Sequence, residues 1–314
     1  MLLKWLFDIS PQETSFARRG FRGDNPAARA RLEQVGAAFV LGYRAALTDA
    51  QPDSLAPILD GADLVFRGFA YEGAAMALAL RDWFTPWKRE RVANFLRVAG
   101  DAHTYMVHVG AGWVLARVPG SVNNFLARFD PLLRWLLIDG YGFHEGFFHW
   151  PKYLQAGRPA PARLQGYARR VFDQGLGRCL WFIDGTDVKM IPQTIAALPR
   201  ERHADLWSGV GLAAVYAGEV TAAELESLRA AAGSFQPQLA QGAAFAAKAR
   251  QRADNSTLYQ DLACGVLCGV SAREAAHITD AALENLPAND AEPAYEIWRR
   301  RIQKEFSRGR ELKR

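Results

Sequence analysis

Residues 70–83 read AYEGAAMALALRDW, a run in which apolar residues recur with the period of an α-helix. Prolines such as Pro86, Pro119 and Pro199 fall between this run and others like it, where a helix tolerates a missing amide. The nearest strand candidates, 62–69 and 179–185, are short. The sequence therefore predicts an all-α fold. The other helical runs span 28–48, 88–99, 102–117, 131–149, 163–173, 201–217, 222–232, 239–253 and 271–284.

A signature of small residues recurs along these runs about every 35 residues, the length of one helical-hairpin repeat. A glycine inside a helix costs about 1 kcal/mol relative to alanine, so recurring glycines indicate that two helices, or a helix and a ligand, approach closely. We expect stacked antiparallel helical hairpins, formed either by ordinary small-residue packing or as a helical-repeat superhelix with an internal pseudo-duplication. The signature occurs at Glu72-Gly73, Gly110-Ala-Gly112, Glu145-Gly146, Gln174-Gly-Leu-Gly177, Gly209-Val-Gly211 and Gln241-Gly242.

Length and composition are those of a globular protein. The chain has 314 residues, of which 50% are apolar and 23% charged, enough to bury a core without disulfides. Its three cysteines form neither a disulfide framework nor a zinc pattern, which favours a reducing compartment. The first ten residues are too short and too charged for a signal peptide, and no segment is long enough to span a membrane. We therefore predict a cytoplasmic protein with a single helical domain over 1–290, including an N-terminal arm over 1–27.

The net charge of +5 is concentrated at the C-terminus, because removing residues 296–314 takes all of it away. A nucleic-acid partner is therefore not predicted. Residues 291–314 are predicted to form a basic amphipathic helix. Tyr295, Trp298, Ile302 and Phe306 draw one apolar stripe along it, which should dock on the body of the protein. The aromatic anchors should matter more than the surrounding arginines, which we expect to be exposed.

The segment Asp139-Gly-Tyr-Gly-Phe-His-Glu-Gly-Phe-Phe-His149 is the densest in groups that could carry chemistry. Glu145 and His149 share a helix face, so they are the candidate ligands if a metal binds. The two-histidine zinc motif and the paired di-iron motifs are incomplete, so no cofactor is predicted. The alternatives are a buried aromatic core, or a polar cluster inside an aromatic pocket that holds a hydrophobic ligand. We favour the pocket.

Other candidate groups lie in the glycine-rich blocks. Glu72 is an acid in an apolar helical stretch. If it is buried, its pKa would rise and make it a candidate acid or base; alternatively, it is a glutamate at a helix start that the helix dipole stabilises. Arg178 lies among apolar residues and needs a partner such as Asp173, Asp184 or an anionic ligand. Gly175-Leu-Gly177 lacks the strand and third glycine of a dinucleotide site.

Five blocks together resemble the UnbL-type proteins, a family long catalogued as a domain of unknown function whose members accompany enediyne polyketide synthase clusters. They are FRGFAYEGAAMALAL (66–80), VHVGAGWVLARV (107–118), DGYGFHEGFFH (139–149), FDQGLGRCLWF (172–182) and DLWSGVGLAAVYAG (205–218). The resemblance covers about residues 10 to 285 and implies a cytoplasmic bacterial protein that works on, or beside, a highly unsaturated polyketide or related natural product. The polar residues that it carries over by position are Glu72, His108, Trp113, Arg117, His144, Glu145, His149, Asp173, Arg178 and Trp207.

These observations lead to one functional hypothesis and its alternative. In the first, a hydrophobic polyene is cyclised or isomerised without a cofactor by the catalytic candidates His144, Glu145, His149, His108 and Glu72. We expect these five residues and Arg178 to surround one shared cavity. In the alternative, the protein only binds or sequesters the ligand, or serves as a scaffold for partner enzymes. Partner biosynthetic proteins and a homo-oligomer are the expected protein partners. The ligand-binding candidates are Arg178, Asp173, Trp113, Arg117, Phe143, Phe147, Trp181, Trp207 and Tyr216.

Overall fold

The computed structural model describes residues 7–287 and 292–311, and in this part of the chain all regular structure is helical. The all-α prediction is confirmed. Neither strand candidate forms a strand: residues 62–66 turn into α5 (Arg67–Phe84), and 179–183 are the last turns of α10 (Tyr167–Ile183). A short apolar run is compatible with a strand or with a buried helix, and here the longer helix around it decides.

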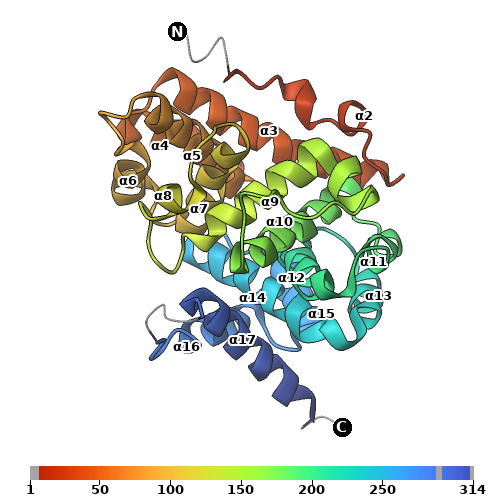
Figure 1. The fold of residues 1–314 in the computed structure, drawn as a ribbon. Helices are drawn as coiled ribbons and strands as arrows, with labels where there is room; N and C mark the ends of the chain where they lie inside the picture. The colour runs from red at the N-terminus through yellow and green to blue at the C-terminus, as the bar shows by residue number, and fades with distance from the viewer. Residues whose placement is uncertain (1–6, 288–291, 312–314) are drawn as a thin grey trace.

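Seven helices form a central array in which each helix packs on the next one along the chain (Figure 1). The helix order follows the chain from the N-terminal side to the C-terminal side of the molecule. Besides α5 and α10, the central array contains α3 (Pro26–Thr48), α7 (Thr104–Gly112), α9 (Trp135–Trp150), α12 (Arg200–Tyr216) and α14 (Gln236–Arg252).

Reciprocal glycine contacts hold neighbouring array helices together. Gly142 of α9 lies against the carbonyl oxygen of Phe172 in α10, and Gly175 of α10 lies against that of Asp139 in α9. A Cβ at either glycine would overlap the facing oxygen. On each helix the carbonyl lies three residues before the glycine, so the two helices run antiparallel. The same exchange joins α3 to α5, α7 to α9, α10 to α12 and α12 to α14.

The G-x-G pattern is explained by the position of each helix between two neighbours. Residues two apart on a helix point about 200° apart, so the two glycines face opposite sides. In α10, Gly175 faces α9 and Gly177 faces α12; in α12, Gly209 faces α10 and Gly211 faces α14. The predicted stacking of antiparallel helices is therefore correct, and its repeat unit is one crossing helix.

In α9 the predicted signature Glu145-Gly146 is not where the helix meets its neighbours. The contact glycines are Gly140, which faces α7, and Gly142, whereas Gly146 lies against the side chains of Cys179 and Leu176. At the crossing of α5 and α7, only α7 contributes a contact glycine. Gly110 lies against the carbonyl of Glu72.

Shorter helices cover the central array. Helix α13 begins at the residue predicted, because Thr221 and Glu224 form a capping box. No helix in the described part of the chain is long and apolar enough to cross a membrane. The covering helices are α4 (Pro52–Asp60), α6 (Arg91–Phe95), α8 (Val122–Leu126), α11 (Met190–Ala196), α13 (Ala222–Ala232), α15 (Leu258–Leu267) and α16 (Ala272–Ala281).

The first and the last described segments both pack on the array. The N-terminal arm includes α2 (Phe16–Arg19), and Phe21 packs edge-on against Phe147 of α9. Helix α17 (Ala294–Glu311) lies beside α14 and α16 (Figure 1). Its predicted apolar stripe is buried against the body, which confirms the docking. The ends of the predicted arm and tail, and part of the predicted boundary between domain and tail, fall in residues 1–6, 312–314 and 288–291, which lie outside the described residues.

Candidate functional site

Five buried polar side chains, each from a different array helix, follow one another along the array, and we call them the polar spine. They are Glu72, Asp139, Gln174, Ser208 and Gln241. Each immediately precedes a contact glycine of its helix, so all five occupy the same position at five of the six crossings of the array. Gln174 Nε2 donates to Asp139 Oδ2 over 2.7 Å, and Ser208 Oγ donates to Gln241 Oε1 over 3.0 Å.

Arg178 connects the first two members of the polar spine. In α7 the equivalent position is Val109, which leaves a gap between Glu72 and Asp139 that Arg178 of α10 fills. Its Nη1 donates to Asp139 Oδ1, and its Nη2 lies 3.8 Å from Glu72 Oε1. Trp113 Nε1 donates to the same Glu72 oxygen over 3.1 Å. The sequence-predicted residues Glu72, Trp113 and Arg178 therefore meet in the middle of the molecule.

Glu72 is an acid poised near neutral pH. Burial raises the pKa of its carboxyl to about 7, because loss of hydration outweighs the opposing charge of Arg178 and the hydrogen bond from Trp113. None of the described residues donates a hydrogen bond to Oε2. A carboxyl of this kind can take or give a proton near pH 7, which is what a general acid or base needs.

Glu72 faces a small cavity that we call the aromatic chamber. Its free volume is about 30 Å³, room for a water molecule rather than for a drug-sized ligand. Thr14 and Ile9 of the N-terminal arm form part of its wall, and Glu72 is its one ionisable lining residue among those described. Seven aromatic rings make up most of the remaining wall: Phe39, Phe69, Trp113, Phe143, Phe147, Phe148 and Phe182.

A second cavity, the tail chamber, lies on the other side of the Glu72–Arg178 pair. Its free volume is about 40 Å³, and Arg178, Asp139 and Tyr216 line it together with Trp298 of α17. Arg178 also stacks on Phe143 of the aromatic chamber, with its guanidinium carbon 4.9 Å from the ring centre. The Glu72–Arg178 pair thus separates two apolar cavities, each closed in part by one end of the chain.

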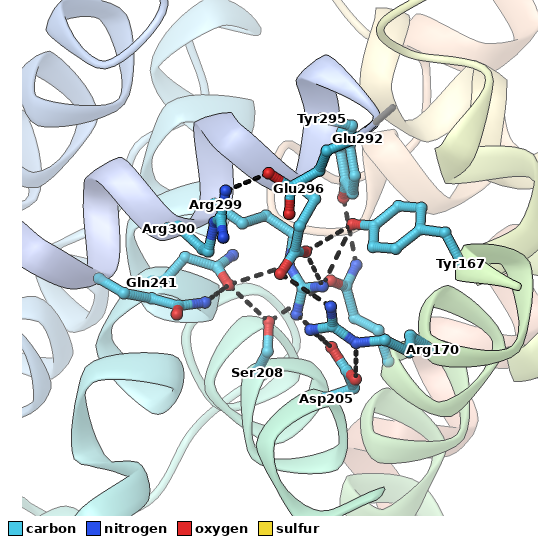
Figure 2. A network of polar contacts seen from close by, with 12 residues as sticks. Tyr167, Arg170, Asp205, Ser208, Gln241, Glu292, Tyr295, Glu296, Arg299 and Arg300 are labelled. Atoms are coloured by element: carbon cyan, nitrogen blue, oxygen red, sulfur yellow. Dashed lines mark hydrogen bonds and ion pairs between the residues drawn. The ribbon is translucent and has the colours of Figure 1, made fainter. Parts of the chain in front are cut away.

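A buried ionic network holds α17 at the end of the polar spine (Figure 2). Arg299 is fully buried; its Nη2 donates to Asp205 Oδ1 over 2.8 Å and its Nη1 to Glu296 Oε2 over 3.1 Å. Arg170 reaches the same two carboxylates from α10. The prediction that the tail arginines are exposed is wrong for Arg299, because a helix that docks beside buried carboxylates needs a cation on the docked face.

His144 and Glu145 form a separate polar group beside the aromatic chamber. Arg117 Nε donates to His144 Nε2 over 3.0 Å, so the ring proton lies on Nδ1, 3.4 Å from Glu145 Oε1. Burial lowers the pKa of His144 to about 4, so the ring is neutral. Burial opposes ionisation of Glu145, but contacts from His144 and from Tyr153, whose hydroxyl donates over 2.8 Å, prevail and lower its pKa. Trp113 lies edge-on to His144 and links this group to the chamber.

The expected single cavity around all six predicted residues does not form. His108 lines a separate pocket of about 410 Å³ with Asp82 and Arg128. His149 is exposed where α9 ends before Pro151. The backbone of His149 departs from helical geometry (φ −135°, ψ 32°), so the four-residue spacing that would place it on one helix face with Glu145 does not apply there.

The predicted ligand-binding residues are likewise divided. Asp173 pairs with Arg202 rather than with Arg178. Trp181 and Trp207 are buried and line neither chamber. Phe143 and Phe147 line the aromatic chamber, and Tyr216 lines the tail chamber.

Metal ligands do not gather at the predicted position. Within the described residues no three His, Cys, Asp or Glu side chains are placed to hold a metal ion. Glu145 contacts His144 and Tyr153 instead of His149.

Sequence reasoning missed most of the polar spine. Asp139, Gln174, Ser208 and Gln241 were visible in the glycine blocks, but only Glu72 was named as a candidate. A signal was present, since each is a polar residue directly before a glycine in a helical run. Arg299 had no such signal, because its burial depends on carboxylates far away in the chain.

Comparison with known proteins identifies a family. The model of a family described as "Protein of unknown function (DUF1702)" matches residues 1–306. Neither a curated protein nor a solved structure matches the chain.

Proposed function

We propose, from the premise that the chain belongs to the DUF1702 family of proteins of unknown function, that it binds a hydrophobic, unsaturated small molecule in the aromatic chamber. We further propose that Glu72 exchanges a proton with this ligand and so catalyses its cyclisation or isomerisation. The observation that carries the proposal is the placement of one partly protonated carboxyl in a wall of aromatic rings. Such a wall excludes water and accepts apolar, π-rich molecules.

We also propose the kind of biosynthetic pathway in which the protein acts. The resemblance of five sequence blocks to the UnbL-type proteins supports an enediyne or related polyketide intermediate in a cytoplasmic biosynthetic setting. In the same proposal, the protein acts beside partner biosynthetic proteins and assembles as a homo-oligomer.

The chamber must widen to hold such a ligand, since its free volume is about 30 Å³. The N-terminal arm is the part of the wall best suited to move. It is held by hydrogen bonds, ion pairs and ring contacts, among them the ion pairs of Asp8 with Arg44 and of Arg22 with Asp184, the hydrogen bond from Trp150 Nε1 to the Arg19 carbonyl and the packing of Phe21 on Phe147. The array helices cannot separate as easily, because reciprocal glycine contacts join them.

The alternative is binding without turnover. It is favoured by the enclosure of both chambers under the chain ends, which would shield a reactive molecule from solvent. In that case Glu72 serves only to close the polar spine.

Two measurements test the proposal. Extracts of the purified protein, analysed by mass spectrometry, should contain an unsaturated hydrophobic molecule. The extracted molecule is then added back to the protein. Its absorbance spectrum should change with time in the presence of wild-type protein and of Glu226→Gln, a control on the exposed surface of α13. It should stay constant on Glu72→Gln, which keeps the shape but loses the proton. Equal turnover by Glu72→Gln would contradict the role of Glu72, and binding without a spectral change on any of the three would favour the alternative.

A further inference from the structure

We propose that the ligand of the aromatic chamber is amphipathic: its unsaturated hydrocarbon part enters the chamber, and an anionic head group remains at the rim on Arg117 and Arg19. This inference rests on the proposed function and names the substrate class of the same site. It follows from which arginines near the chamber already have anionic partners and which do not.

Inside the chamber an anion would be unfavourable. Glu72 is the one ionisable lining residue among those described, and it carries either no charge or a negative one. The cation paired with Glu72, Arg178, already contacts Asp139 and the ring of Phe143 as well. A further buried carboxylate or phosphate would lose its hydration without gaining an unpaired cation. The part of the ligand that is enclosed must therefore be uncharged.

At the rim the charges are arranged differently. Phe148 lines the chamber, and two guanidinium groups lie against its ring. The guanidinium carbon of Arg19 is 5.1 Å from the ring centre, and that of Arg117 is 5.4 Å from it. Arg117 is exposed and makes no ion pair within the described residues; its Nε contacts the neutral ring of His144. Its terminal nitrogens can therefore receive a carboxylate or phosphate.

Arg19 offers a further hydrogen-bond donor beside the same ring. Its Nη2 pairs with Glu13, but its buried Nε has no hydrogen-bond partner. An unsatisfied buried donor beside an exposed guanidinium is the arrangement that a head group with several acceptor oxygens would complete. Because Arg19 belongs to the N-terminal arm, a head group bound there would also hold the arm over the inserted chain.

The test uses parinaric acid, a conjugated tetraene carboxylic acid that fluoresces in apolar surroundings, and its uncharged methyl ester. Wild-type protein should bind the acid about five-fold more tightly than the ester, the size of a partly screened charge contact. Arg117→Gln should bind the two probes equally, while Arg97→Gln, an exposed arginine outside the chamber rim, should keep the preference. Val35→Phe, which fills the chamber, should weaken both probes alike, and its melting temperature reports whether it still folds.

The outcomes separate the two proposals. If neither probe binds to wild-type protein, or if Val35→Phe folds and binds both probes normally, the aromatic chamber is not the binding site and the proposed function fails. If both probes bind in the chamber but equally, or if Arg117→Gln keeps the preference for the acid, the proposed function stands and the anionic head group is refuted.

Discussion

Arg178 Nη2 lies 3.8 Å from Glu72 Oε1, so the two buried groups form an ion pair without a hydrogen bond. The hydrogen bond to that oxygen comes from the neutral indole of Trp113 instead. Arg178 makes its close contact with Asp139. Glu72 is therefore the weakly compensated acid of the centre, and this is why burial can raise its pKa to about 7.

The first prediction concerns the pH dependence of stability in Glu72→Gln. The pKa of Glu72 is raised from 4.5 to about 7, so the folded state holds this proton more tightly than the unfolded state does. Glu72 therefore lowers the free energy of unfolding as pH rises from 4.5 to 7, by an amount on the order of 3 kcal/mol. Relative to wild type, Glu72→Gln should become more stable over this interval. Urea unfolding at pH 5 and pH 7.5 measures it, with Glu226→Gln as the control that shows no such trend.

The second prediction concerns the array glycines. Gly209→Ala places a methyl group into the backbone of α10, so the helices must separate and the free energy of unfolding should fall by roughly 3 kcal/mol or more. Gly265→Ala is the matched control, because this helical glycine of α15 has open space where a Cβ would lie. It should stabilise the protein by about 0.5–1 kcal/mol through helix propensity. Thermal melts of the two variants should move in opposite directions; equal shifts would show that the crossings are loose.

The third prediction compares two neighbouring arginines of α17. Arg299→Met leaves Asp205 and Glu296 buried with Arg170 as their remaining cation, and should cost about 3 kcal/mol. Arg300→Met removes a half-exposed pair with Glu292 and should change stability by less than about 1 kcal/mol. Denaturant unfolding followed by circular dichroism compares them. Similar small effects would mean that the apolar stripe alone docks the helix.

The fourth prediction concerns the N-terminal arm. Phe21→Ala removes the ring that packs on Phe16 and Phe147, so the arm should detach more often while the array stays folded. Trypsin should then cleave after Arg18, Arg19 or Arg22 several-fold faster than in wild type. Leu258→Ala, which truncates a fully solvent-exposed side chain elsewhere, should leave the rate unchanged. Unchanged cleavage in Phe21→Ala would indicate that the arm is not a movable cover.

The fifth prediction concerns His144. Its pKa is lowered from 6.5 to about 4, so the folded state resists protonation and loses stability as pH falls from 6.5 to 4. His144→Gln should lose less stability than wild type over that interval. His277→Gln, at an exposed position on α16, provides the control. Thermal melts at pH 7 and pH 4.5 would contradict the prediction if all three proteins lost stability equally.

Much of the fold was readable from local pattern. The 3.6-residue period and the prolines between runs indicated the helix class, and the predicted run 222–232 coincides with α13. The predicted helix over 163–173 ends before α10 does, because Cys179 to Ile183 form a short apolar run that a strand could also contain. Residues 52–60 and 258–267 were not predicted as helices, and α4 and α15 form there.

The sequence by itself determined which surfaces of each helix approach a neighbour, because a glycine at a fixed offset is a local property of the chain. It also determined that Glu72 lies in an apolar stretch. Only the tertiary structure decided what surrounds each charge. Arg178 contacts Asp139 rather than Asp173 because residues 178 and 173 leave α10 on different sides, and Arg299 is buried because α17 docks where Asp205 lies. Pairing of buried charges depends on distances across helices remote in sequence, which no local pattern encodes.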